Sequence, residues 1–335
     1  MISRVADSCF WFGRYIERAE SSARLLQATR SLVFDADIPV THCWQPLVIV
    51  SGEEAPFVER HGREALGNGE LVQEYMTWSR ENLVSLNSSV RAARDCARSI
   101  RDQLSLELWE EINELYLFLG RESTETLYWE NREEFYRHVR RTTQLILGLV
   151  RSTMMHGEAM RFLWMGVMLE RTAQTARILD MHHHTMMRES AHEIVRMALW
   201  MSLLRASSGH ETFMKKHQGR VSAQSMVEFV LFDLTFPRSI QYTLKAAAEQ
   251  LSRIWTEPHS SRARLNSLNA WVEQQKKELE IGQIHSVLTY VVDETTSICS
   301  KISEEIQGPQ RATRVGDPGP APASGQSQSQ SQSAP

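Results

Sequence analysis

Two glutamate–arginine doublets are the residues of this chain best placed to do chemistry. The doublet Glu17-Arg18 returns 153 residues later as Glu170-Arg171, and seven of the eighteen residues around each doublet are identical. Average composition would match about one residue by chance. A carboxylate beside a guanidinium can act as an acid or base, or can hold a polar substrate. The repeat predicts two related helices, opening near residues 3 and 158, with this charged motif at the centre of the molecule.

The helical period places the shared residues of each copy on one stripe, because residues four or seven positions apart share a face. These are Gly13, Glu17 and Arg24 in the first copy, and Gly166, Glu170 and Arg177 in the second. Each glycine leaves room beside its glutamate for another helix or a ligand to approach closely.

Two interpretations of the doublets stay open. In the structural one, the copies face each other, Glu17 pairs with Arg171 and Glu170 pairs with Arg18, and the pairs fix helix register. In the functional one, Glu17 or Glu170 is a general base and the arginines, Arg24 and Arg177 included, bind a carboxylate or phosphate.

A second cationic cluster follows a helical spacing of three, four and three residues. It consists of Arg91, Arg94, Arg98 and Arg101, with Ser105 beyond its end. Such a stripe is either a solvated face with local ion pairs or an anion site, since arginine binds phosphate and carboxylate bidentately. We expect Arg94, Arg98, Arg101 and Arg238 to supply anion contacts, with Trp11, Trp109 and Trp164 as walls of the site.

No metal or cofactor is expected. His182, His183 and His184 are consecutive and so point in different directions on a helix, and Glu189-x-x-His192 has no second copy of the kind that di-iron bundles use. No phosphate-binding glycine loop or nucleophile motif is present.

The elements that must position these residues are helices. No proline occurs between Pro56 and Pro237, and that stretch is rich in Leu, Met, Ala, Glu and Arg. The sequence predicts an all-α bundle in one domain, residues 1–307, and a disordered tail, 308–335. Helices are expected over 3–34, 56–66, 70–119 (as one helix or two), 123–155, 158–183, 187–206, 210–217, 222–235, 237–256, 259–278 and 281–306, with 35–56 as a connecting segment.

Charge and cysteine content narrow the function classes. The net charge of −4 offers no basic excess for nucleic acid. Four scattered cysteines form no C-x-x-C pair, which fits a reduced cytoplasm. No apolar run of about 18 residues predicts a membrane span.

Several blocks of the sequence resemble the bacterial alpha-E family. The opening, residues 2–20 (ISRVADSCFWFGRYIERAE), is the most specific, and 94–113, 166–171 and 229–239 are similar to later blocks. The second copy departs from the first at Val167-Met168, which replace Arg14-Tyr15. The family is a predicted helical domain of unknown function, so the resemblance implies a helical fold and no defined reaction.

The resemblance also implies partners. Alpha-E proteins are typically encoded beside, or fused to, circularly permuted ATP-grasp enzymes, often with transglutaminase-like proteins. ATP-grasp enzymes join carboxylates to amines. We therefore expect an accessory or substrate-handling partner of such a ligase in peptide synthesis or modification. An enzyme in its own right and a non-catalytic scaffold are the alternatives.

Overall fold

The computed structural model describes residues 1–335 except 36–38, 189–192, 256, 258 and 309–335. Within this described part, fifteen α-helices and three short 3-10 helices form, and there is no β-strand. The predicted all-α class is confirmed. No helix among the described residues is long and apolar enough to cross a membrane. The expected tail, apart from Gly308, and the Glu189-x-x-His192 spacing lie outside the described residues.

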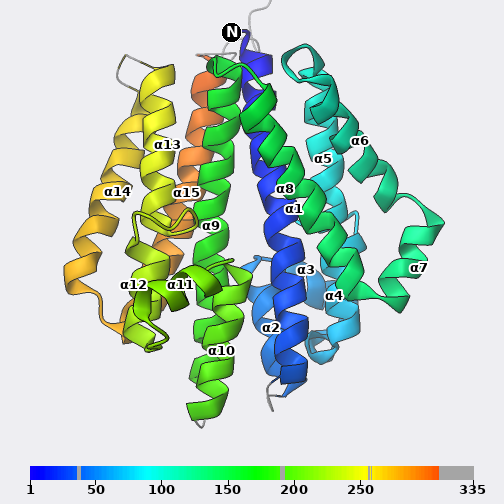
Figure 1. The fold of residues 1–335 in the computed structure, drawn as a ribbon, viewed down its shortest axis with the longest axis vertical. Helices are drawn as coiled ribbons and strands as arrows, with labels where there is room; N and C mark the ends of the chain where they lie inside the picture. The colour runs from blue at the N-terminus through cyan, green and yellow to red at the C-terminus, as the bar shows by residue number, and fades with distance from the viewer. Residues whose placement is uncertain (36–38, 189–192, 256, 258, 309–335) are drawn as a thin grey trace, which may run out of the picture.

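Two long helices, α1 (Ser3–Asp35) and α9 (Glu158–Arg188), lie side by side at the centre of the molecule (Figure 1). Their closest approach is at the two repeat glycines. A Cβ on Gly13 would lie 2.1 Å from the carbonyl oxygen of Leu163, and a Cβ on Gly166 would lie 2.1 Å from that of Phe10. The contact is reciprocal, as expected for copies related by a pseudo-twofold axis. The glycines therefore make room for a helix rather than for a ligand.

The other helices pack around this pair as two flanking groups. On α1 lie α5 (Leu86–Ser99) and α8 (Arg132–Thr153), and α6 (Leu106–Leu119) packs on both. On α9 lie α13 (Ile240–Ile254) and α15 (Ile284–Gln307), both of which contact α14 (Ser260–Glu278). Each repeat helix thus has two principal flanking helices.

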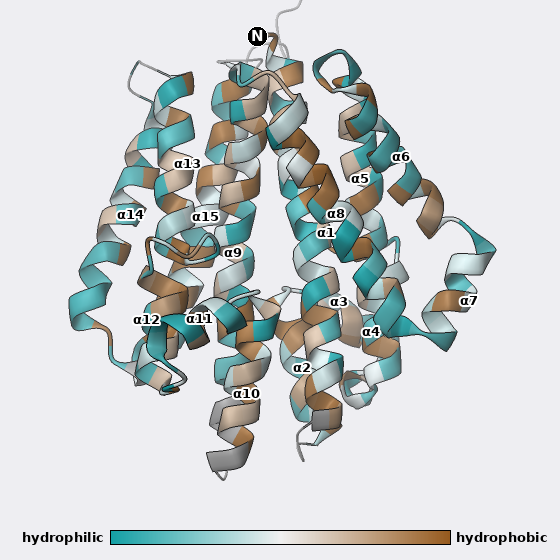
Figure 2. Cartoon of the chain, in the orientation of Figure 1, coloured by the Kyte–Doolittle hydropathy of each residue, from teal (hydrophilic) through white to brown (hydrophobic). Residues whose placement is uncertain are grey.

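The remaining helices close the bundle around these groups. They are α2 (Val40–Val50), α3 (Glu54–His61), α4 (Gly69–Trp78), α7 (Glu122–Glu130), α10 (Glu193–Ala206), α11 (His210–His217) and α12 (Ala223–Phe232), with 3-10 turns at Arg63–Gly67, Arg101–Gln103 and Ile281–Gln283. Figure 2 shows mostly hydrophilic residues on the outer helices α7 and α14. The buried apolar side chains form one continuous core that includes residues of α1, α5, α8, α9, α13 and α15.

Several predicted boundaries were wrong, and most errors come from short turns. The segment 35–56, expected to be a connection, contains α2 and the start of α3. The run 70–119 is three α-helices, which Ser85 and Ser105 divide by capping backbone N–H groups. The run 123–155 is interrupted at Asn131, which caps α8. Pro237 lies in the loop before α13, whose N-cap is Ser239.

Candidate functional site

The two doublets pair reciprocally across the α1–α9 contact. Arg171 donates to both carboxylate oxygens of Glu17, from Nε at 2.9 Å and from Nη2 at 2.7 Å. Arg18 donates to Glu170 in the same way, at 2.7 Å and 3.0 Å. Both carboxylates are buried, Glu17 at 0% and Glu170 at 1% exposure. The predicted reciprocal pairing is confirmed, and the bidentate geometry fixes the register of the two helices.

Further arginines surround the same carboxylates. Arg14 donates to Glu170 at 2.9 Å. Arg238, from the loop before α13, bridges Glu17 at 3.1 Å and Glu20 at 2.8 Å. Sequence reasoning expected Arg238 to bind an anion but missed Glu20 as one of its partners.

Glu20 is fully buried and also pairs with Arg24. The Glu20–Arg24 spacing of four residues on α1 was the available sequence signal, since side chains so spaced share a helix face. We call Glu17, Glu20, Glu170 and the arginines that pair with them the Glu–Arg network.

The network holds the carboxylates of Glu170 and Glu20 ionised. Burial acts to raise the pKa of Glu170, but Arg18 and Arg14 outweigh it, and the pKa falls well below its usual range. Burial likewise acts to raise the pKa of Glu20, and Arg238 and Arg24 bring it below its usual range. A carboxylate whose pKa is depressed in this way is a weak base at neutral pH. The geometry therefore favours the structural interpretation for Glu170.

One arginine of the repeat has no carboxylate partner in the described structure. Arg24 pairs with Glu20, four residues earlier. The equivalent of Arg24 in the second copy is Arg177, and the residue four before it is Ala173. No ion pair or hydrogen bond of the Arg177 guanidinium is found with any described residue. Burial lowers the pKa of Arg177, and Glu170 partly opposes this effect.

The cluster consequently carries more positive than negative charge. Around three buried glutamates lie six arginines: Arg14, Arg18, Arg24, Arg171, Arg177 and Arg238. Buried charge without a partner is costly, so an excess of guanidinium groups favours the entry of an anion.

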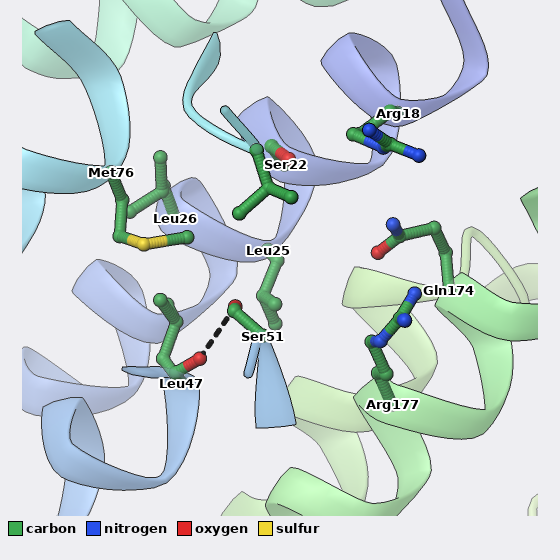
Figure 3. A pocket seen from close by; sticks show the side chains of 10 residues that line it. Arg18, Ser22, Leu25, Leu26, Leu47, Ser51, Met76, Gln174 and Arg177 are labelled. Carbon is green, nitrogen blue, oxygen red and sulfur yellow. Dashed lines mark hydrogen bonds between the residues drawn. The ribbon is translucent and has the colours of Figure 1, made fainter. Parts of the chain in front are cut away.

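A pocket opens at this excess charge, and Figure 3 shows the side chains that line it. Arg18 and Arg177 both line it, and Figure 3 shows the side chain of Gln174 between theirs. The amide of Gln174 donates to Glu170 at 3.0 Å, which leaves its oxygen toward the pocket side of the network. The rest of the lining is mostly apolar, with two serine hydroxyls among it; its residues are Ser22, Leu25, Leu26, Leu47, Ser51, Met76 and Val84. The cavity is small, with a volume of about 50 Å³.

The arginine stripe of α5 lies elsewhere. The helix ends at Ser99, so Arg101 falls in a 3-10 turn and does not continue the stripe. Arg94 donates to Asn113 of α6 at 3.3 Å, and Arg94 and Arg101 lie over the ring of Trp109, at 6.0 and 5.1 Å from its centroid. Arg98 is exposed. Arg94 and Arg101 therefore lie against α6, and no hydrogen bond or ion pair between the stripe and the doublets is found among the described residues.

The tryptophans expected as walls do not line the pocket. Trp11 donates from its indole to Ser303 at 3.0 Å, and Arg14 lies over its ring. Trp164 carries Arg151 over its ring, 4.7 Å from the centroid. Leucine, methionine, valine and serine side chains line the pocket instead. Trp11 lies two helical turns before Arg18 on α1, and its indole is directed to Ser303 of α15.

Fold and site together define an all-helical domain built on two copies of a Glu-Arg motif. The chain belongs to the Alpha-E family: the model of that family, described as a predicted alpha-helical domain with a conserved ER motif, matches residues 1–308. The resemblance seen in the sequence is thereby confirmed.

Three curated relatives carry names without a function. They are an uncharacterized protein of Mycobacterium bovis and uncharacterized proteins of two Mycobacterium tuberculosis strains. Each is 25% identical over 286 residues, which covers 77% of this chain and 30% of the relative. This chain thus spans less than a third of the length of these relatives. No solved structure matches the chain.

Proposed function

We propose that this protein is a cytoplasmic, substrate-handling partner of a circularly permuted ATP-grasp amide or peptide ligase. In this proposal the pocket between α1 and α9 holds a carboxylate group of the substrate. The identity of the partner, with a transglutaminase-like protein as a possible third member, rests on the family resemblance. The proposal that the ligand carries a carboxylate rests on the residues of the site.

The observation that carries the proposal is Arg177. The guanidinium of Arg177 lies at the pocket, next to Arg18 and the amide of Gln174. Among the described residues it has no carboxylate partner. A carboxylate entering there would meet two cations and lie against the mostly apolar rest of the lining. An ATP-grasp ligase activates carboxylates, so a partner that binds one has a role in the same reaction.

The acid–base alternative has less support at the same site. Glu170 accepts hydrogen bonds from Arg14, Arg18 and Gln174. Its depressed pKa leaves it little tendency to take a proton at neutral pH. Pairs of this kind also fix the register of α1 and α9, so the scaffold role belongs to the same residues and is compatible with substrate handling.

Binding of a carboxylate can be tested with simple probes. Sodium glutarate and sodium glutamate should raise the melting temperature of the full chain above that in sodium chloride of equal ionic strength. At ten times its dissociation constant a ligand adds about 1.4 kcal/mol of stability. Arg177→Gln should lose the effect. The exposed Arg253→Gln, which removes the same charge outside the pocket, should keep it. An equal shift in wild type and Arg177→Gln would overturn the carboxylate site.

The partnership needs a separate experiment. Tagged wild-type protein and Glu17→Gln/Glu170→Gln protein are used as baits in cytosol of the native organism, and bound proteins are identified by mass spectrometry. Recovery of an ATP-grasp protein with both baits is expected if docking does not use the buried network. Adding the purified chain should then raise the product yield of that ligase. Failure of both baits to recover an ATP-grasp protein would refute the partnership but not the carboxylate site.

A further inference from the structure

A cluster of two histidines and an aspartate lies on a second pocket, which Arg177 also lines. Asp180 and His184 are one turn apart on α9, and His285 is in the first turn of α15. One donor atom from each residue lies within 4.8 Å of the other two. The three residues belong to two helices that are packed against each other, so the fold holds them together.

Only one of the two histidines is hydrogen-bonded to the aspartate. Nδ1 of His285 is 2.7 Å from Oδ1 of Asp180, a good hydrogen bond. Nε2 of His184 is 3.6 Å from Oδ2 of the same carboxylate, which is too long for one. The two imidazole rings are 4.8 Å apart and inclined at 67°, so they do not stack. Both rings instead direct a nitrogen toward one carboxylate.

We propose that Asp180, His184 and His285 bind a divalent transition-metal ion of the zinc type. Two imidazole nitrogens and one carboxylate oxygen are a donor set that zinc accepts, with a fourth position left for water or another ligand. The Asp-x-x-x-His spacing puts two ligands on one helix face, as in helices that bind zinc through residues i and i+4. The third ligand comes from the neighbouring helix.

The geometry needs only a small adjustment to close on a metal. Bond lengths of about 2.0–2.2 Å in a tetrahedral site place donor atoms roughly 3.3 Å apart. The longest separation in the cluster is 4.8 Å or less. His285 is half exposed, so its ring can rotate toward the other two donors, whereas Asp180, at 14% side-chain exposure, is fixed by packing.

The surroundings leave the fourth position accessible. The pocket beside the cluster measures about 1200 Å³, open solvent included, and extends along α15 past Thr289 and Asp293. An ion held by the three ligands would face this space, so a metal can enter from solvent without opening the core.

The proposal is tested by titrating Co²⁺ and Zn²⁺ into the full chain after its affinity tag has been removed. Calorimetry should show one ion per chain, and Co²⁺ should give visible absorption bands of a coordinated ion. His285→Gln and Asp180→Asn should each weaken binding by at least roughly 10-fold, because even loss of an outer-shell partner costs about 10–100-fold. His156→Gln, a surface histidine outside the cluster, should bind as wild type does.

Two results would overturn the metal site. One is wild-type binding no tighter than that of His285→Gln; the other is equal weakening by His156→Gln, which would indicate binding to surface histidines in general. Circular dichroism of each variant checks that the fold is intact. His285 is half exposed near the start of its helix, so His285→Gln keeps the test valid even if Asp180→Asn is unstable.

Discussion

Replacing Gly13 by alanine tests whether the close contact of α1 and α9 holds the molecule together. The added methyl carbon would lie 2.1 Å from the Leu163 carbonyl oxygen, whereas real Cβ contacts below 3.0 Å essentially do not occur. The helices must therefore separate by about 1 Å in a core packed as densely as a crystal. Overpacking typically costs about 1–3 kcal/mol. A backbone carbonyl cannot rotate away, so we expect the upper end of this range.

The matched control is Gly148→Ala in α8. Gly148 is also inside a helix, but an added Cβ there meets nothing within 4 Å. Alanine should stabilise that position by about 0.5–1 kcal/mol, since glycine is the poorer helix former. The same gain offsets part of the clash at Gly13, which leaves a net loss of about 2 kcal/mol. The two variants should thus differ by about 3 kcal/mol.

Urea unfolding followed by circular dichroism measures these differences through the transition midpoints. Gly166→Ala should match Gly13→Ala, because the two glycines make the same contact from opposite sides. The double variant should lose less than the sum, since the second methyl enters a gap that the first has already opened. A Gly13→Ala protein as stable as Gly148→Ala would refute the reasoning.

Three further predictions concern buried ionisable groups. Arg171→Ala should lower the free energy of unfolding by about 3 kcal/mol, the lower end for a broken buried pair, because Arg238 still contacts Glu17; an unchanged urea midpoint would contradict this. The pKa of Glu170 is depressed in the folded state, so its stabilisation is complete above the ordinary value of 4.5 and is lost as the pH falls below it. Acid titration should then show a steeper loss in wild type than in Glu170→Gln. Burial lowers the pKa of His182 to about 4, so stability is full above its ordinary value of 6.5 and falls as the pH drops from 6.5 to 4, by about 3 kcal/mol. His182→Leu should lack this loss of stability. Equal urea midpoints of wild type and His182→Leu from pH 6.5 to pH 4 would contradict the prediction.

The sequence predicted the centre of the fold because the repeat encodes it directly. Gly13, Glu17 and Arg24 recur at one spacing, and a helix period converts that spacing into a shared face. Two copies of one charged motif on facing helices can pair reciprocally, and this was one of the two interpretations that the residues left open; the structure shows Glu17 paired with Arg171.

Other features depended on contacts between distant segments and could not be inferred from spacing. Arg238 reaches Glu20 from a loop 218 residues away. His285 meets Asp180 across 105 residues, although the three consecutive histidines drew attention to a different set. The arginine stripe is shorter than predicted for a local reason: α5 ends at Ser99, and the following turn carries Arg101 out of register with Arg91, Arg94 and Arg98.

The two copies differ where the proposed chemistry lies. The residues that hold α1 against α9 are shared, but Glu20 of the first copy corresponds to Ala173 in the second, which leaves Arg177 without a carboxylate. Further along, Asp180 and His184 correspond to Gln27 and Ser31, which cannot form the same donor set. A pseudo-twofold frame with identical contact residues can tolerate such changes, because register is already fixed by the glycines and the reciprocal pairs. Substitutions in the frame should therefore alter stability, whereas substitutions at Arg177 and His184 should alter ligand binding with little effect on folding.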